Sequence, residues 1–262
     1  MKTLKGKIAL VTGGTRNVGK GIALALGEAG ATVYVTGRSI TKSDVKGITN
    51  IGGKGISVVC NHENDDEVKA VFDLIEKNEG KLDILVNNAW GGYNRLRNRK
   101  TYSGFKWKAP FWEQPTDLWE EMNNVGVRSN YISSIYAANL MLKQKHGLIV
   151  NISFYASRKY YGNVIYGIAK AAVDKMTMDM SVELKKHRIA CVSLYPGYID
   201  DKKKAPNPKK ESSQFVGRTI AALASDKEII KRTGQILVAA ELAKEYGFKD
   251  IDGTQPEPFD QL

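Results

Sequence analysis

Short apolar runs alternate along the chain with longer segments in which apolar residues recur every three or four positions. The apolar runs predict strands at residues 7–12, 33–35, 56–60, 82–86, 148–152, 189–194 and 235–238. The longer segments predict helices at 18–29, 65–77, 125–142 and 166–185, because side chains at that spacing share one helix face. Continuous apolar strands separated by helices are typical of a parallel sheet covered on both faces. We therefore expect an α/β fold, a Rossmann-type doubly wound parallel sheet of about seven strands with helices on both faces.

The length of 262 residues suits one large domain better than two. We expect a single domain over residues 1–262, with variable substrate loops at 90–115 and 198–216. The Pro-Asn-Pro at 206–208 predicts that the second loop is not helical. The first residues lead directly into a strand, and no apolar run is long enough to cross a bilayer. We therefore expect neither a signal peptide nor a membrane span.

The two cysteines bear on the cellular compartment. Cys60 and Cys191 lie in or beside apolar runs, so we expect buried thiols, with neither a disulfide nor a metal site. Free thiols are typical of a reducing compartment, which predicts a cytoplasmic location.

The net charge of +11 favours an anionic ligand, a nucleic acid or an anionic membrane surface as a partner. Residues 91–112 hold six basic side chains and no acid, and residues 202–210 hold five lysines. Solvated loops explain both segments most simply. Aromatic side chains at Tyr93, Tyr102, Phe105 and Trp107 lie among the first set, where they suit base stacking or the lining of an apolar substrate pocket. We expect the pocket and no nucleic-acid partner, and we keep membrane-surface contact as an alternative.

A glycine-rich segment separates the first predicted strand from the first helix. Residues 12–19 read Thr-Gly-Gly-Thr-Arg-Asn-Val-Gly. A turn there lets backbone N–H groups and the helix N-terminus face a pyrophosphate. The spacing alone is weak evidence, and its position between strand and helix strengthens it. The candidate cofactor contacts in this turn are Gly13, Thr15, Arg16, Asn17, Val18 and Gly19.

The end of the second strand predicts which cofactor binds. An NAD-binding unit usually carries an Asp or Glu there, which binds the ribose 2′-hydroxyl. Here Gly37 and Arg38 follow the strand, and no acid is present. Gly37 leaves room for a 2′-phosphate, and the guanidinium groups of Arg38 and Arg16 suit phosphate oxygens. We therefore predict NADP(H) in preference to NAD(H).

The ends of other strands add candidate cofactor contacts, because ligands of open parallel sheets bind beyond the carboxyl ends of the strands. Asn61 and His62 follow the third strand, and Asn88 follows the fourth. A Tyr-Pro-Gly turn after the sixth strand contributes Pro196 and Gly197, with Ile199 close behind. Ordinary strand-end turns are the alternative explanation for these positions.

The pattern Tyr-x-x-x-Lys occurs four times, at Tyr102/Lys106, Tyr155/Lys159, Tyr166/Lys170 and Tyr198/Lys202. A spacing of four places two side chains on one face only in a helix. Tyr166/Lys170 opens the predicted helix 166–185, whereas the other three pairs lie in predicted loops or directly after a strand. Only the Tyr166/Lys170 pair is therefore expected to be held rigidly.

That pair suits proton transfer to a carbonyl oxygen. A phenol has an ordinary pKa of about 10, and a nearby ammonium group is expected to lower it towards neutrality. The phenol can then donate a proton as a hydride arrives, or accept one in the reverse direction. Ser153, at the end of the fifth strand, is placed to donate a hydrogen bond to the carbonyl. The predicted catalytic residues are therefore Ser153, Tyr166 and Lys170.

Taken together and in this order, these motifs resemble those of the short-chain dehydrogenases/reductases, over almost the whole chain. The resemblance implies hydride transfer between a nicotinamide and a carbonyl or alcohol. It also implies a homodimer or homotetramer in which the outer faces of helices 125–142 and 166–185 pair. The segments 123–128 and 242–253 are similar to a family member that implies NADPH-dependent reduction of steroids and carbonyl xenobiotics. That likeness adds the cytosolic face of the endoplasmic reticulum as an alternative location.

Four positions depart from the pattern of that family. Asn17 replaces the middle glycine of the cofactor turn, and Asn tolerates a positive φ better than most residues. Trp90 replaces the glycine of Asn-Asn-Ala-Gly, and Asp201 stands where a threonine usually follows the Pro-Gly turn. Gly126 aligns with the catalytic asparagine, while Asn124 lies two places earlier. These last departures leave a cofactor-binding protein without turnover as the alternative to an enzyme.

Overall fold

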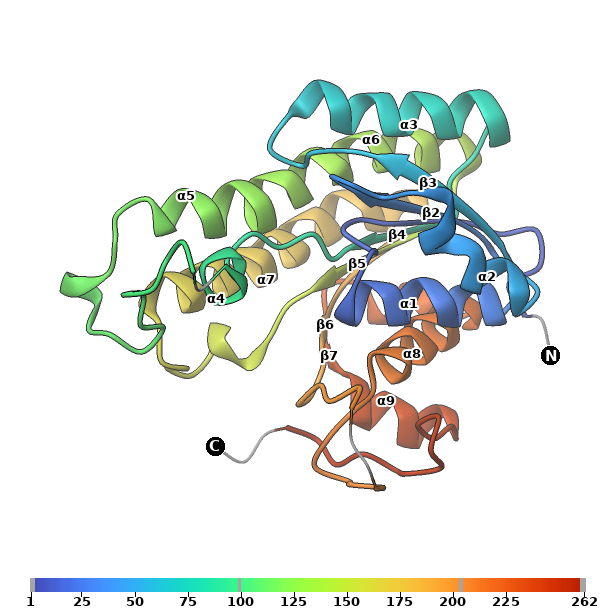
Figure 1. Cartoon of the computed structure of the whole chain (residues 1–262). Helices are drawn as coiled ribbons and strands as arrows, with labels where there is room; N and C mark the ends of the chain where they lie inside the picture. Colours follow the sequence, from blue (N-terminus) through green and yellow to red (C-terminus); the bar gives the residue numbers. More distant parts are fainter. Residues whose placement is uncertain (1–2, 99, 203–204, 260–262) are drawn as a thin grey trace.

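The computed structural model describes residues 3–98, 100–202 and 205–259, so Arg99, Lys203 and Lys204 of the basic segments lie outside the described residues. Seven parallel strands form one sheet in the order β3-β2-β1-β4-β5-β6-β7 (Figure 1). The strands are β1 Ile8–Val11, β2 Thr32–Gly37, β3 Lys54–Val59, β4 Ile84–Asn87, β5 Gly147–Ile152, β6 Ile189–Tyr195 and β7 Ile236–Val238. This confirms the predicted doubly wound sheet, with every expected strand present.

Helices cover both faces of the sheet. The helices α1, α8 and α9 lie on one face, and α3, α6 and α7 lie on the other (Figure 1). The helices are α1 Asn17–Glu28, α2 Lys46–Asn50, α3 Asp65–Glu79, α4 Asn94–Arg97, α5 Leu118–Asn123, α6 Ser129–Gln144, α7 Val164–Leu184, α8 Ser213–Ser225 and α9 Ala239–Tyr246. After β3 the chain crosses back to the other side of β1, so β4 pairs with β1 and the strand order reverses there. Sheets of this kind bind ligands at such a switch point, beyond the carboxyl ends of the two strands.

Two large buried clusters, one on each face of the sheet, form the main core, and a third, smaller cluster contains Tyr166. Because side chains alternate along a strand, Ala9 and Val11 of β1 join the cluster beneath α1 and α8, whereas Ile8 and Leu10 join the cluster beneath α3 and α6. The core therefore follows from the continuous apolar strands.

Both cysteines are free and buried, as expected. Burial raises the pKa of the Cys60 and Cys191 thiols to about 12, so both stay protonated at neutral pH. Within the described residues, no three or more His, Cys, Asp or Glu side chains gather where they could hold a metal ion. Among the same residues, no helix has the length and apolar character needed to cross a membrane.

Two boundaries differ from the prediction. The helix expected over 125–142 begins only at Ser129, because the backbone breaks at Val125 and Gly126 and a separate short helix, α5, precedes the break. The loop expected over 198–216 ends at α8, where the Ser212 side chain accepts the Phe215 N–H and caps the helix. The prolines at 206–208 lie in non-helical chain, as predicted.

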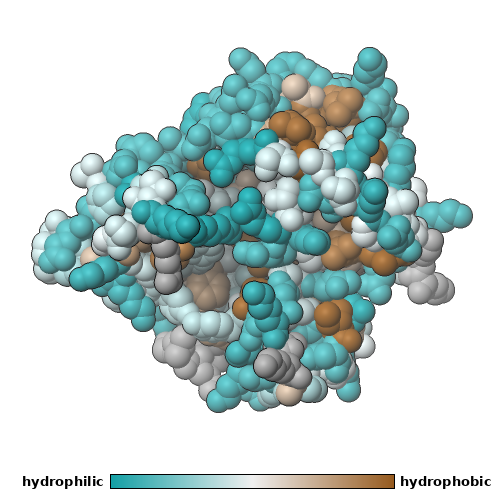
Figure 2. Space-filling view, in the orientation of Figure 1, coloured by the Kyte–Doolittle hydropathy of each residue, from teal (hydrophilic) through white to brown (hydrophobic). Residues whose placement is uncertain are grey.

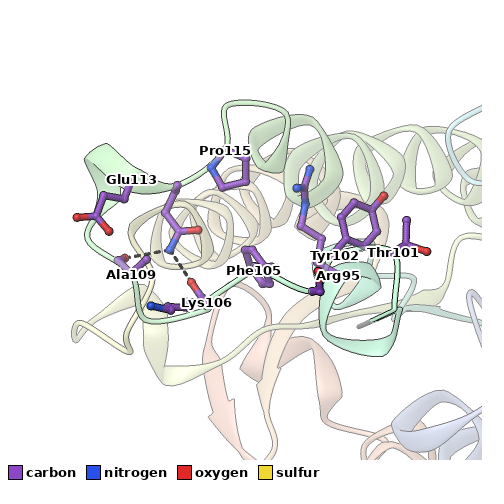
Figure 3. Close-up of a pocket in the computed structure, with 11 residues that line it drawn as sticks. Arg95, Thr101, Tyr102, Phe105, Lys106, Ala109, Glu113 and Pro115 are labelled. Carbon is purple, nitrogen blue, oxygen red and sulfur yellow. Dashed lines mark hydrogen bonds between the residues drawn. The ribbon is translucent and has the colours of Figure 1, made fainter.

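The segment 90–115 extends away from the sheet towards α5 and α7 (Figure 1). Its first arginine, Arg95, is 7% exposed and is not a solvated charge. It forms ion pairs with Asp117 and Glu121, and its guanidinium lies over the rings of Tyr102 and Phe105. A pocket of about 420 Å³ opens beside these side chains (Figure 3), and its lining contains neither Tyr166 nor Lys170.

The surface in view is mostly hydrophilic, with separate hydrophobic patches (Figure 2). Phe111 and Trp112, in the same segment, are 63% and 73% exposed, so these two aromatics do not line an enclosed pocket. The expectation that the whole aromatic segment faces the substrate is therefore too broad, and only its first part packs inwards.

Candidate active site

Tyr166 and Lys170 lie on the first turns of α7, one helical turn apart and both buried. The helix begins there because the Asn163 side chain accepts the Tyr166 N–H at 3.0 Å. The lysines of the other three Tyr-x-x-x-Lys pairs are exposed and lie outside helices. The structure therefore holds only this pair rigidly, as the helical spacing predicted.

Aromatic rings surround Tyr166 on several sides. The centroid of its ring lies 5.3 Å from Trp107, 5.6 Å from Trp90 and 6.3 Å from both Tyr93 and Phe154. The Tyr93 hydroxyl donates a hydrogen bond to the Tyr166 hydroxyl at 3.4 Å. Tyr166 is therefore enclosed by an apolar shell that contains one phenolic partner.

Lys170 reaches from α7 towards the loop after β4. Its Nζ donates to the Ile152 carbonyl at 3.2 Å and lies 4.4 Å from the centroid of the Trp90 ring. The same nitrogen is 5.8 Å from the centroid of the Tyr166 ring. Burial lowers the pKa of Lys170 to about 8, and the Asp174 carboxylate opposes that shift.

The expected lowering of the Tyr166 pKa is not observed. Burial, followed by the neighbouring Tyr93, raises the pKa of Tyr166 well above its ordinary value. The physical reason is that the Lys170 ammonium faces the Trp90 ring and the Ile152 carbonyl. Tyr166 is thus a neutral phenol at physiological pH in this state.

Ser153 directly follows β5 and is buried beside α7. Its Oγ donates to the Lys170 carbonyl at 3.3 Å, and its N–H donates to the Leu194 carbonyl at 3.0 Å. The structure thus brings Ser153 to the helix that carries the tyrosine and the lysine. Its contact with a substrate carbonyl stays a prediction.

The glycine turn has the shape that its sequence predicted. Asn17 adopts a φ of +46°, so it takes the left-handed conformation expected of a glycine substitute. A Cβ at Gly13 would lie 2.9 Å from the Ala89 Cα, so the turn packs directly on the loop after β4. The Asn88 side chain donates hydrogen bonds to the carbonyls of Thr12 and Gly13, so Asn88 stabilises the turn.

The start of α1 carries no side-chain cap. Arg16 stands at the N-cap position and is exposed, and its side chain accepts no N–H from the first turn. Thr15 packs its methyl group beside Gly37. No side chain therefore caps the N–H groups at Val18 and Gly19, and their contact with a cofactor phosphate stays a prediction.

His62 stabilises the glycine turn through a hydrogen bond with Thr36. Its Nε2 lies 2.7 Å from the Thr36 hydroxyl, which accepts the Gly13 N–H at 3.0 Å. Burial lowers the pKa of His62 to about 4, so the ring is neutral at pH 7. Asn61 accepts the Glu63 N–H and forms a local turn. These contacts give both residues a structural role, and their contact with a cofactor stays a prediction.

The turn after β6 is held by two carboxylates. Glu211 accepts the Gly197 N–H at 2.8 Å and pairs with Ile199 in an isolated bridge, which fixes the chain beyond Pro196. Asp201 accepts both the N–H and the hydroxyl of Ser213, at 2.7 and 2.6 Å. Both oxygens of the Asp201 carboxylate therefore bind the start of α8. We infer from this that Asp201 does not take over the role of the threonine found at this position in the family.

Three arginines converge near the glycine turn. Arg97 of α4 lies close enough to Arg16 and Arg38 for their charges to lower its pKa, after the larger effect of burial. Within residues 3–98, 100–202 and 205–259, none of the three forms an ion pair. Mutually repelling guanidinium groups without a carboxylate fit a bound phosphate.

Comparison with known proteins agrees with this geometry. The short chain dehydrogenase family model matches residues 7–212. The chain is 36% identical to dehydrogenase/reductase SDR family member 1 of Homo sapiens and 38% identical to that of Mus musculus, over 95% of this chain and 85% of each relative. A short-chain type dehydrogenase/reductase from Mycobacterium marinum has a similar structure, with a TM-score of 0.75, 25% identity and coverage of 90% of this chain and 94% of that one.

The chain belongs to the short-chain dehydrogenase/reductase family. It is an oxidoreductase that acts on a CH–OH or C=O group of a small-molecule substrate with NAD(P). The uncapped start of α1, the close turn at Gly13 and the unpaired arginines fit the phosphates of that dinucleotide.

The sequence placed Tyr93 among the aromatic side chains of a pocket, but it did not predict that Tyr93, Arg97 and Asp174 lie near the Tyr166/Lys170 pair or the glycine turn. Tyr93 and Arg97 come from an irregular loop, where no periodicity shows which side chains point inwards. Asp174 lies one helical turn beyond Lys170, and its spacing on the predicted helix was the one signal available for it.

Proposed function

We propose that this protein is an NADP(H)-dependent oxidoreductase that interconverts a bulky, mostly apolar carbonyl compound and its alcohol. The observation that carries the proposal is the buried Tyr166/Lys170 pair inside an enclosure of aromatic rings. A cofactor-binding role without turnover does not require a buried phenol beside a buried amine.

Tyr166, Lys170 and Ser153 have separate roles in the proton transfer. When bound, the nicotinamide supplies or accepts the hydride. The raised pKa of Tyr166 keeps its proton on the phenol, so Tyr166 donates it to the carbonyl oxygen during reduction. The Lys170 ammonium lowers the cost of the negative charge left on Tyr166 when it turns from the Ile152 carbonyl towards the phenol oxygen. The Ser153 hydroxyl turns from the Lys170 carbonyl to hold the substrate oxygen.

The preference for NADP(H) rests on the arginine cluster. Arg16 and Arg38 flank the glycine turn and the end of β2, and no acid follows that strand. Arg97 of α4 adds a third positive charge close to these two. A 2′-phosphate adds about −2 charge at pH 7, which compensates the repulsion among these guanidinium groups.

The substrate class follows from the enclosure. Trp90, Tyr93 and Trp107 from the loop after β4 face Phe154 and Tyr161 from the segment after β5. Such a lining favours a large apolar ligand with one polar group. Tyr160, directly before Tyr161, is 72% exposed and lies outside this lining.

The test is NADPH oxidation by purified protein with a panel of carbonyl compounds. Aromatic and steroid ketones are expected to give a higher kcat/KM than small 2-oxo acids. The matched control is Tyr166→Phe, which keeps the ring and removes the proton donor. A preference for small charged substrates contradicts the substrate class, and no turnover of any carbonyl contradicts the proposed function.

A further inference from the structure

The backbone conformation at Gly126 favours glycine. Its φ is +144°, a conformation that L-residues rarely adopt, and Val125 before it also leaves the helical region. The break is stabilised on both sides. The Val125 carbonyl accepts the Gly91 N–H at 2.9 Å, and the Gly126 N–H donates to the Ser129 hydroxyl at 3.1 Å.

The Trp90 ring occupies the space that a side chain at position 126 would need. A Cβ on Gly126 would lie 2.4 Å from Cε3 and 2.5 Å from Cζ3 of Trp90. These distances are far below a van der Waals contact, and the ring atoms belong to a rigid side chain packed against Tyr166. Trp90 and an asparagine at position 126 therefore exclude each other.

The same indole ring lies against the lysine of the site. The Lys170 Nζ is 4.4 Å from the Trp90 centroid, within the range of a cation–π interaction, and Trp is the aromatic residue that binds cations best. The interaction is shielded from water because Lys170 is 7% exposed. The Ile152 carbonyl is the one hydrogen-bond acceptor within reach of Nζ among the described residues.

We propose that Trp90 takes the place of the asparagine that the family carries at position 126, as a positioning residue that holds Lys170 in its charged form. The proposal rests on the proposed function. The electron-rich ring face favours the ammonium over the neutral amine, which offsets part of the cost of burial. The pair Trp90 and Gly126 thus replaces one polar contact with an aromatic one.

Other titratable groups act on the same lysine and must be separated from Trp90. Asp174, on α7, favours the charged lysine, and its carboxylate accepts a hydrogen bond from Tyr195 of β6. Tyr166 and Tyr93 stay neutral because burial raises the pKa of both. A substitution at position 90 removes none of these groups, and Trp90→Phe keeps an aromatic ring beside Tyr166 and Tyr93, so it is measured together with Trp90→Leu.

The direct test is the pKa of Lys170, measured by NMR on cofactor-free protein with ¹³Cε-labelled lysine. Lys170→Met assigns the signal. We expect the pKa to fall by about one pH unit in Trp90→Leu and by less in Trp90→Phe. Trp112→Leu, which removes an exposed tryptophan of the same loop, should leave it unchanged. An unchanged Lys170 pKa in Trp90→Leu, or in Trp90→Phe should the leucine variant not fold, overturns the proposal.

This measurement needs no substrate, so it stays informative if the proposed function fails. In an active enzyme, the alkaline limb of kcat/KM should move to lower pH in Trp90→Leu by the same amount as the lysine pKa. A limb that stays in place while the lysine pKa moves overturns the link to catalysis.

The mutual exclusion is tested by a double-mutant cycle. Gly126→Asn should lower the melting temperature of the wild-type protein and should do so far less in a Trp90→Gly background. The double variant should also recover at least part of the turnover lost in Trp90→Gly. Additive effects on the melting temperature would show that the two positions do not compete for the same space.

Discussion

The Tyr93 hydroxyl donates a hydrogen bond to the Tyr166 hydroxyl at 3.4 Å, although the two residues lie 73 positions apart. Tyr93 contributes to the raised pKa of Tyr166 and so helps to keep the proton on the Tyr166 hydroxyl until it is donated. We expect Tyr93→Phe to lower kcat by about tenfold with a smaller effect on KM, because the variant loses one net hydrogen bond. Steady-state kinetics measure both constants. A rise in kcat/KM would instead mean that Tyr93 blocks the substrate oxygen.

Tyr166→Phe is expected to reduce kcat by about 10³-fold, since it removes the general acid and keeps the ring packing. NADPH affinity, measured by fluorescence titration, should stay within about twofold because no charge is altered. Lys170→Ala should weaken both turnover and NADPH binding. Tyr155→Phe is the matched control, because Tyr155 lies in a short 3₁₀ turn outside α7. Loss of activity in Tyr155→Phe, with activity retained in Tyr166→Phe, would identify the other pair as catalytic.

The arginine cluster predicts how cofactor preference responds to mutation. The wild type should have a higher kcat/KM with NADPH than with NADH, and Arg38→Ala should shrink that ratio by about tenfold, as expected for one charge-assisted contact. Arg97→Ala should shrink it by a smaller factor. Lys108→Ala, from the same basic loop, is the control and should leave the ratio unchanged. Equal efficiency of the wild type with both cofactors contradicts the prediction.

The outer faces of α6 and α7 predict a homo-oligomer. Tyr131 and Ile135 on α6 are 50% and 40% exposed, and Ile168 and Val182 on α7 are 42% and 77% exposed. These adjacent apolar faces suit pairing across a two-fold axis. We expect light scattering to give at least twice the 28.9 kDa monomer mass at micromolar concentration, and Val182→Glu to shift the protein towards the monomer.

The matched control for that substitution is Val59→Glu, since Val59 is 63% exposed on β3 at the edge of the sheet, away from these helices. It should keep the wild-type mass. A wild-type mass of 28.9 kDa would contradict the oligomer.

Local sequence determined the sheet and the placement of Tyr166 and Lys170 on one helix. The inner strands are nearly continuous apolar runs because both faces of a parallel sheet are buried, so their pattern is visible without tertiary information. Tyr166 and Lys170 were found in the same way, because the apolar stripe beyond them has the period of a helix. Asn17 was expected to accept a positive φ from its side-chain chemistry alone, and its φ is +46°.

The tertiary structure alone decided which loop residues complete the site. Nothing in the order of residues 90–97 shows that Trp90 fills the space above Gly126, that Tyr93 meets Tyr166, or that Arg97 approaches Arg38. The break at Gly126 was hidden for the same reason, since an apolar pattern runs through it. Periodicity records the face that a residue presents within its own element, whereas these contacts join segments remote in sequence and depend on how the loop packs against α6 and α7.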